Sequence, residues 1–214
     1  MQIVLTGANR GIGHAMYQSY QAAGHDVLGT ARGHEGFHSL DVTRPAEFAG
    51  LAQALDGKPV DLLICNAGVY LDKGHSLADG YAPEVWAQSF AANVTGVFQT
   101  IQTLMPNLQM AEAGKIAIIS SQMASDTRAP GGSYAYRASK AAALNLGRNL
   151  ATDLKGLGIA VGIYHPGWVK TDMGGDAADI TVEESAKGLV QQFADLSLAT
   201  TGCFNTWDGR AHAF

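Results

Sequence analysis

The chain has 214 residues, of which 47% are hydrophobic and 15% are charged, and its formal net charge is −5. This composition is ordinary for a globular protein and predicts a single domain over residues 1–214. The net charge is acidic and no cluster of Lys and Arg stands out, which argues against nucleic-acid and acidic-membrane partners. No apolar run approaches the ~18 residues that would span a membrane. Cys65 and Cys203 lack a CxxC spacing and the first residues lack a signal-like pattern, so we expect a reducing, cytoplasmic setting.

Short runs rich in β-branched residues and leucine recur along the chain and predict strands that are covered on both faces. They occupy residues 2–6, 26–30, 60–68, 115–120 and 159–167, with a weak last run at 203–207. Within residues 84–108, hydrophobic side chains recur every three or four positions and predict an amphipathic helix: Trp86, Phe90, Val94, Val97, Ile101, Leu104 and Leu108. This alternation predicts an α/β fold with a single Rossmann-type, doubly wound parallel sheet.

The connection after the second predicted strand is unusually short. Only about six residues separate it from a short apolar stretch at residues 37–40, whereas a parallel crossover takes about a dozen or more. We therefore expect the helix between the second and third strands to be missing, and the third strand to be short.

A glycine-rich stretch, TGANRGIG at residues 6–13, follows the first strand and precedes a predicted helix. Gly7 permits a tight turn, Gly11 lets the backbone approach a pyrophosphate, and Gly13 allows the helix to pack closely on the sheet. A phosphate would lie at the positive end of the helix. The spacing is GxxxGxG rather than GxGxxG, so a plain structural turn is the alternative to a dinucleotide site.

Arg10 and Arg32 bear on which dinucleotide would bind. The second strand ends in GTARG, without the carboxylate that NAD sites usually place about twenty positions after the loop. Guanidinium groups match phosphate geometry, so the two arginines favour the ribose phosphate of NADP(H). The alternative is that both are ordinary solvated charges.

Tyr136 and Lys140 are spaced i, i+4 and therefore project from one face of a helix. A cation beside a phenol favours the phenolate, so we expect Lys140, together with a positively charged nicotinamide, to lower the pKa of Tyr136 and make it a proton shuttle. The alternative is a tyrosine packed on the core and a solvated lysine.

Six motifs in a fixed order resemble the short-chain dehydrogenase/reductase family over nearly the whole chain. They are TGANRGIG, NAG at 66–68, AANVTG with Asn93, IISS at 118–121, YRASK at 136–140 and HPGWVKTDM at 165–173. The phrases HPGWVKTDMGG, TVEESAKGL and WDGRAHAF look most like the C-factor/sniffer-type carbonyl reductase branch of that family.

The resemblance implies a catalytic set of Asn93, Ser121, Tyr136 and Lys140. Tyr136 would protonate the carbonyl oxygen, and Lys140 would hold the nicotinamide ribose. Ser121, rather than Ser120, would hydrogen-bond the substrate oxygen, although it could equally cap the strand end. Asn93 would belong to a water-mediated proton relay, and an asparagine within a helical pattern also often marks a local irregularity.

The resemblance also implies which residues would bind the cofactor. They are Gly7, Asn9, Arg10, Gly11, Ile12, Gly13, Arg32, Asp41, Val42, Asn66, Ala67, Gly68, Tyr136, Lys140, Pro166, Gly167, Val169 and Thr171. Asp41 could instead cap the helix that follows it.

The implied activity is reduction of a ketone or aldehyde with NADPH, and the implied partner is a small hydrophobic carbonyl or alcohol. Trp168 and Tyr134 are the expected apolar walls of its pocket. No metal site is expected, because the seven histidines lack ligand spacing. A homo-oligomer, either a dimer or a tetramer, is compatible with the resemblance. A protein that uses the same fold for cofactor-dependent signalling or redox sensing is the alternative.

Overall fold

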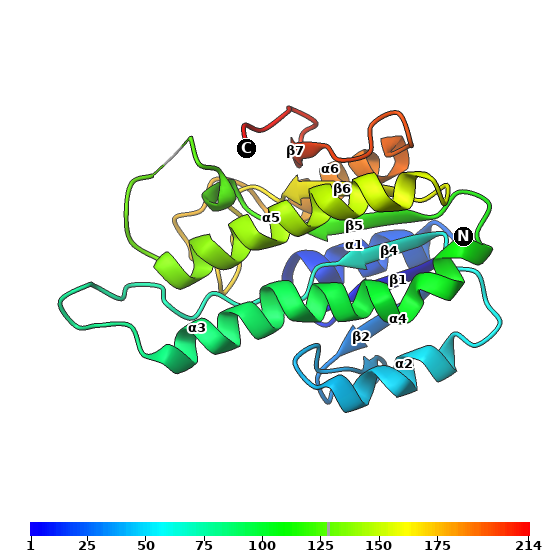
Figure 1. Ribbon diagram of the computed structural model, residues 1–214, viewed down its shortest axis with the longest axis horizontal. Helices are drawn as coiled ribbons and strands as arrows, with labels where there is room; N and C mark the ends of the chain where they lie inside the picture. Colours follow the sequence, from blue (N-terminus) through cyan, green and yellow to red (C-terminus); the bar gives the residue numbers. More distant parts are fainter. Residues whose placement is uncertain (128) are drawn as a thin grey trace.

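The computed structural model describes residues 1–127 and 129–214, and within them the chain builds one seven-stranded sheet flanked by helices (Figure 1). The strands are β1 (Gln2–Thr6), β2 (Asp26–Ala31), β3 (His38–Ser39), β4 (Leu62–Cys65), β5 (Lys115–Ile119), β6 (Ala160–His165) and β7 (Phe204–Thr206). They lie in the order β3-β2-β1-β4-β5-β6-β7, and every neighbouring pair is parallel. The predicted Rossmann-type sheet is therefore confirmed.

Helices follow most strands. They are α1 (Gly11–Ala22), α2 (Phe48–Ala54), α3 (Pro83–Phe90), α4 (Gly96–Met110), α5 (Tyr134–Lys155) and α6 (Val182–Asp195), with short turns η1 (Pro45–Glu47), η2 (Ala91–Thr95) and η3 (Gln122–Ala124). Residues 32–37, between β2 and β3, form turns and bends rather than a helix. The predicted absence of this helix and the shortness of β3 are both confirmed.

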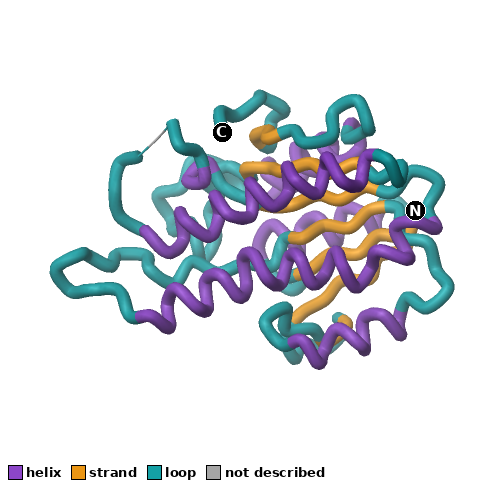
Figure 2. The backbone as a smooth tube through the Cα atoms, viewed as in Figure 1, coloured by secondary structure: helices purple, strands orange, loops and turns teal. Residues whose placement is uncertain are grey.

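The sheet carries a separate apolar core on each face. Helices α2, α4 and α5 cover one face, whereas α1 and α6 cover the other, so that the strands lie between two helical layers (Figures 1 and 2). Successive residues of a strand point to opposite faces. Val4 accordingly packs with the first helical layer, and Ile3 and Leu5 pack with the second.

The predicted helix at 84–108 forms as α3, the π-helical turn η2 and α4 in succession. A π turn inserts an extra residue and therefore shifts which face of the helix is buried. Val97 and Ile101 after the turn are buried as predicted, but Trp86 before it is 36% exposed. Placing Trp86 on the buried face was therefore wrong, because the periodicity does not run through the π turn.

Strand β4 ends at Cys65, three residues before the predicted end of the run at 60–68. The N–H of Asn66 donates to Thr6 Oγ1 at 3.1 Å, so the chain turns away from the ladder and toward the end of β1. Among the described helices, none is both long and apolar enough to cross a bilayer.

Candidate active site

The glycine loop lies between β1 and α1 and is closely packed. Gly7 and Gly11 have φ angles of +70° and +53°, which favour glycine. A Cβ on Gly13 would lie 2.1 Å from Gly7 O, so a larger residue would displace the loop. The loop is thus a narrow backbone cradle at the start of α1, with Asn9 in its turn, and its shape fits a pyrophosphate group.

The chain after β4 is fastened to this loop. Asn66 Nδ2 donates to Thr6 O at 3.0 Å and to Gly7 O at 3.1 Å, while Thr6 Oγ1 accepts the N–H of Ala67 at 3.1 Å. The structure therefore brings Asn66 and Ala67 together with the glycine loop, as the resemblance implies.

The two arginines proposed to recognise phosphate lie at the surface. Arg10 Nη1 contacts Asp172 Oδ2 at 2.9 Å, with the two side chains 63% and 85% exposed. Exposed ion pairs contribute at most about 1 kcal/mol, so this contact leaves Arg10 able to exchange Asp172 for another anion. Arg32 follows β2 and is exposed.

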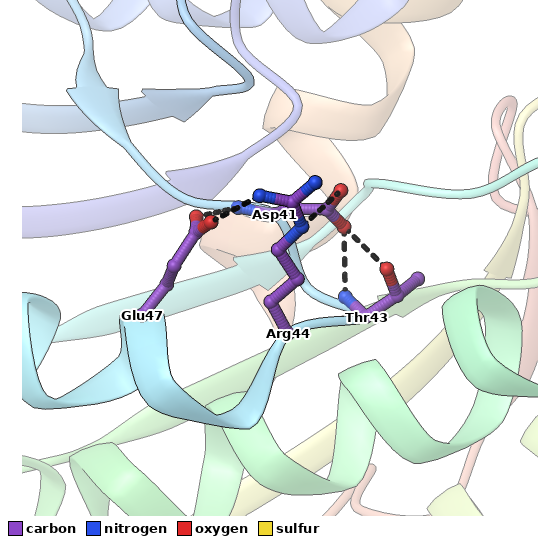
Figure 3. Close-up of polar contacts among 4 residues, drawn as sticks. All are labelled: Asp41, Thr43, Arg44 and Glu47. Atoms are coloured by element: carbon purple, nitrogen blue, oxygen red, sulfur yellow. Dashed lines mark hydrogen bonds and ion pairs between the residues drawn. The ribbon is translucent and has the colours of Figure 1, made fainter.

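Asp41 lies after β3 in a compact polar turn (Figure 3). Its Oδ1 accepts the N–H and hydroxyl of Thr43 at 2.9 and 2.7 Å, and its own N–H donates to Glu47 Oε2 at 2.6 Å. Partial burial opposes ionisation of Asp41, but the Thr43 hydrogen bonds and the charges of Arg32 and Arg44 lower its pKa. The residue preceding η1 is Arg44, so Asp41 shapes the turn rather than capping the helical turn that follows.

Val42, the next residue, lies against the start of α4. A Cβ on Gly96 would come within 2.8 Å of Val42 Cβ. Gly96 thus lets α4 approach the predicted adenine-binding segment. The sequence did not indicate this role, because an isolated glycine within a helical pattern carries little signal.

Asn93 lies in the π turn and is 1% exposed, so the predicted local irregularity is confirmed. Its Oδ1 accepts the N–H of Val69 at 2.8 Å, and its Nδ2 donates to Val69 O and to Ser139 Oγ, both at 2.9 Å. A Cβ on Gly68 would lie 2.9 Å from Asn93 Oδ1 and 3.3 Å from Lys140 Nζ. Asn93, Gly68 and Lys140 therefore converge, with Asn93 holding the segment after β4 against α5.

Tyr136, Lys140 and Ser121 also converge. Tyr136 and Lys140 lie on the first turns of α5, and both are buried. Ser121, just beyond β5, lines the same cavity as Tyr136, and its hydroxyl favours the Tyr136 phenolate. Lys140 Nζ lies 5.8 Å from the centre of the Tyr136 ring and donates to Ile119 O at 3.0 Å. Ser120 instead donates to Lys140 O at 3.0 Å and so faces the helix backbone.

The electrostatics bear on the expectation that Lys140 lowers the pKa of Tyr136. Burial raises the pKa of Tyr136 to about 12; Tyr70 and Asp72 act in the same direction, and the Ser121 hydroxyl opposes them. Burial also lowers the pKa of Lys140 to about 8. Among the groups of this chain desolvation therefore dominates, and the phenol holds its proton firmly. The predicted lowering depends also on the charge of a bound nicotinamide and stays a prediction.

Two neighbours of Tyr136 were missed by the sequence analysis. The ring of Tyr70 stacks on that of Tyr136, with centroids 4.2 Å apart and an interplanar angle of 22°. The carboxylate of Asp72, which is 0% exposed, accepts the N–H groups of Ala135 and Tyr136. Both residues follow β4 in a loop without a recognisable pattern.

The segment after β6 completes the site. Gly167 has a φ of +89°, and a Cβ there would lie 2.4 Å from Ile180 Cδ1. Pro166 O accepts the hydroxyl of Ser185 at 2.6 Å, and Val169 bridges to Ile180. The methyl of Thr171 lies 3.5 Å from the Cβ position of Gly11, so this segment reaches the glycine loop.

A cavity of about 330 Å³ connects these elements. It is lined in part by Ile12, Tyr70, Ser121, Met123, Tyr136, His165, Trp168, Val169, Thr171 and Met173. Trp168 is thus a wall of the cavity, as predicted. Tyr134 is not, because its ring packs edge-on against Tyr81 with centroids 5.4 Å apart.

A glycine loop after β1 and a buried Tyr–Lys–Ser group at the carboxyl edge of a parallel sheet define a dinucleotide-dependent oxidoreductase site. The chain belongs to the short-chain dehydrogenase family, whose model, described as short chain dehydrogenase, matches residues 1–181. The resemblance drawn from the sequence motifs is confirmed.

Individual relatives agree with this assignment. The chain is 36% identical to C-signal of Myxococcus xanthus over 155 residues, which is 71% of this chain and 90% of that protein. It is 33% identical to 1-hydroxy-2-glutathionyl-2-methyl-3-butene dehydrogenase of Rhodococcus sp. (strain AD45) over 224 residues, covering 97% and 96% of the two chains. The crystal structure of NADPH-bound carbonyl reductase from chicken fatty liver superposes with a TM-score of 0.90 at 30% identity, covering 100% of this chain and 98% of that one.

Proposed function

We propose that this protein is an NADPH-dependent carbonyl reductase that converts a ketone or aldehyde to an alcohol, with Tyr136 as the proton donor. The observation that carries the proposal is that Tyr136 and Ser121 line one cavity, with Lys140 beside the Tyr136 ring. The structural neighbour that contains NADPH supports the choice of cofactor.

NADPH supplies the hydride when it is bound, and the chain supplies position and acidity. The glycine loop would hold the pyrophosphate, and Arg10 and Arg32 would bind the ribose phosphate. Asp41 and Val42 would flank the adenine, and Asn66, Ala67 and Gly68 the adenosine wall. Lys140 would hold the nicotinamide ribose, next to the segment from Pro166 to Thr171.

Reduction adds a hydride to the carbonyl carbon and a proton to its oxygen. Ser121 would donate a hydrogen bond to that oxygen, and Tyr136 would give it the proton. A phenol whose pKa is raised to about 12 is protonated at neutral pH, as a donor must be. Lys140, with a pKa near 8, can exchange protons with solvent in the physiological range and would return one to Tyr136, with Asn93 as the next member of the relay.

The walls of the cavity support a modest hydrophobic substrate. Tyr70, Met123, Trp168 and Met173 provide apolar surface. Asp172, Asp176 and Asp179 follow in the segment after β6 and would disfavour acidic carbonyls, by less than about 1 kcal/mol because these charges are solvated. Assembly as a dimer or tetramer is part of the proposal, and light scattering after size exclusion measures it.

The test is NADPH oxidation with a panel of aldehydes, ketones and quinones. Wild type should turn over at least one class, and Tyr136→Phe should lose that activity while still binding NADPH. Tyr134→Phe is the matched control, because Tyr134 lies on the same helix turn but outside the cavity lining, and it should behave as wild type. Tight NADPH binding without turnover of any carbonyl would contradict the proposal.

A signalling or redox-sensing function is the second candidate, favoured by the 36% identity to C-signal. In that case partner binding should depend on NADPH or NADP⁺ and survive Tyr136→Phe unchanged. A partner retained equally by wild type and Tyr136→Phe, together with no turnover by wild type, would favour this candidate.

A further inference from the structure

The N-terminus of α5 is capped in an unusual way. Its N-cap residue, Ser133, has a φ of +51°, in the left-handed region, and its side chain makes no capping hydrogen bond. An N-cap serine normally has an extended backbone, from which its hydroxyl accepts an N–H of the first turn. The Ser133 hydroxyl instead pairs with the hydroxyl of Tyr70.

The missing acceptor comes from the β4–α3 loop (residues 66–82). Asp72 Oδ2 accepts the N–H of Ala135 at 2.8 Å, and Asp72 Oδ1 accepts the N–H of Tyr136 at 3.2 Å. The first N–H groups of a helix lack partners within the helix, and a carboxylate there is also favoured by the helix dipole. A 0% exposed aspartate with these two partners is therefore tied to the backbone of the proton donor itself.

The same loop contacts Tyr136 through its ring and is itself held in place. Tyr70 stacks on Tyr136, and the side chain of Asn93 hydrogen-bonds both the N–H and the carbonyl oxygen of Val69. We define residues 69–72 as the clamp: Asn93 anchors one end, and Asp72 joins the other end to α5. Neither Tyr70 nor Asp72 belongs to a motif that indicated the site.

We propose that Asp72 is a positioning residue for Tyr136: its carboxylate replaces the helix's own N-cap and fixes the first turn of α5, and with it the phenol, against the catalytic cavity. The catalytic part of this inference rests on the proposed carbonyl reduction. The position of the Tyr136 hydroxyl then depends on Asp72, which lies 64 positions earlier in the chain and does not itself line the cavity.

The charge of Asp72 adds a second effect. The titratable groups around Tyr136 are Tyr70 and Asp72 of the clamp and Lys140 of α5, together with Lys73 and His165, which line the same cavity. A negative charge disfavours the phenolate, so Asp72 helps to keep the pKa of Tyr136 raised. Removing the charge while keeping the shape should allow Tyr136 to ionise at lower pH.

Two substitutions separate these effects. Asp72→Ala removes both acceptor oxygens, whereas Asp72→Asn restores one acceptor without the charge. Asp79→Ala is the matched control, since Asp79 belongs to the same loop but is exposed and bonds only locally to Ser76. Misplacing a catalytic group by about 1 Å costs about 100-fold, so Asp72→Ala should lower kcat about 100-fold with KM and the Kd for NADPH nearly unchanged. Asp72→Asn should recover most of kcat, and Asp79→Ala should match wild type.

A readout that needs neither cofactor nor substrate completes the test. Amide hydrogen exchange at Ala135 and Tyr136 should be faster in Asp72→Ala than in wild type and close to wild type in Asp72→Asn. In protein with labelled tyrosine rings, the Tyr136 resonance, assigned by its loss in Tyr136→Phe, should titrate at lower pH in Asp72→Asn. If Asp72→Ala fails to fold, the Tyr136 titration and the kcat of Asp72→Asn test the proposal instead.

The positioning role would be overturned if a folded Asp72→Ala protein exchanged both amide hydrogens as slowly as wild type does. A kcat equal to that of wild type in this variant would also overturn it. An Asp72→Asn protein with exchange as fast as Asp72→Ala, or with an unchanged Tyr136 titration, would also count against it. Wild type that turns over no carbonyl would refute the proposed function alone, because the exchange and titration results would still report on the clamp.

Discussion

Replacing Lys140 by methionine should abolish activity and yet stabilise the protein. Lys140 is 5% exposed, and burial lowers its pKa from 10.5 to about 8. That difference means that the charged, buried amine destabilises the folded state by about 3 kcal/mol. Loss of the hydrogen bond to Ile119 O costs about 1 kcal/mol, so Lys140→Met should be about 2 kcal/mol more stable near pH 7.

The higher stability of Lys140→Met relative to wild type should depend on pH in a defined direction. Because the folded pKa lies below the unfolded one, the unfolded chain binds more protons between about pH 8 and pH 10.5, and the wild type becomes more stable as the pH rises through that window. The advantage of Lys140→Met is therefore complete below pH 8 and disappears toward pH 10.5. Urea denaturation of the cofactor-free protein across this range measures it.

The matched control is Lys155→Met, at the exposed end of the same helix, which should change stability by less than about 0.5 kcal/mol. A Lys140→Met protein that is less stable than wild type near neutral pH would refute the reasoning. So would a gain that remains constant through the window, because it would then come from packing rather than from the buried charge.

Three other substitutions test the architecture of the site. Asn93→Leu leaves both backbone groups of Val69 without their partner and should destabilise the fold by about 2–4 kcal/mol in urea denaturation; an unchanged midpoint would contradict the anchoring role. Gly13→Ala should abolish NADPH binding in a fluorescence titration, because its Cβ would lie 2.1 Å from a loop carbonyl, whereas Gly156→Ala, with open space around its Cβ, should bind as wild type. Arg32→Ala should raise the Kd for NADPH about tenfold and leave that for NADH unchanged, because a charge-assisted contact contributes about 1.5–3 kcal/mol. Equal affinities of the wild type for the two nucleotides would refute the proposed phosphate recognition.

Features that depend on local spacing could be predicted from the amino-acid sequence alone. The parallel strands follow from short buried runs, and the missing helix follows from the length of one connection. The i, i+4 spacing places Tyr136 and Lys140 on one helix face whatever the rest of the fold does. Glycines at 7, 11 and 13 likewise mark a tight loop, because their positions follow from the strand before them and the helix after them.

The distant residues that complete the site could be identified only in the folded chain. The clamp joins Asp72 to Ala135 across 63 positions, and the burial of Trp86 is changed by a π turn that no periodicity indicates. The acidity of Tyr136 also cannot be derived from spacing, because spacing reveals a neighbouring lysine but not how little water reaches either group. Local patterns are set by backbone geometry within a few residues, whereas desolvation and long-range contacts exist only once the two helical layers have closed over the sheet.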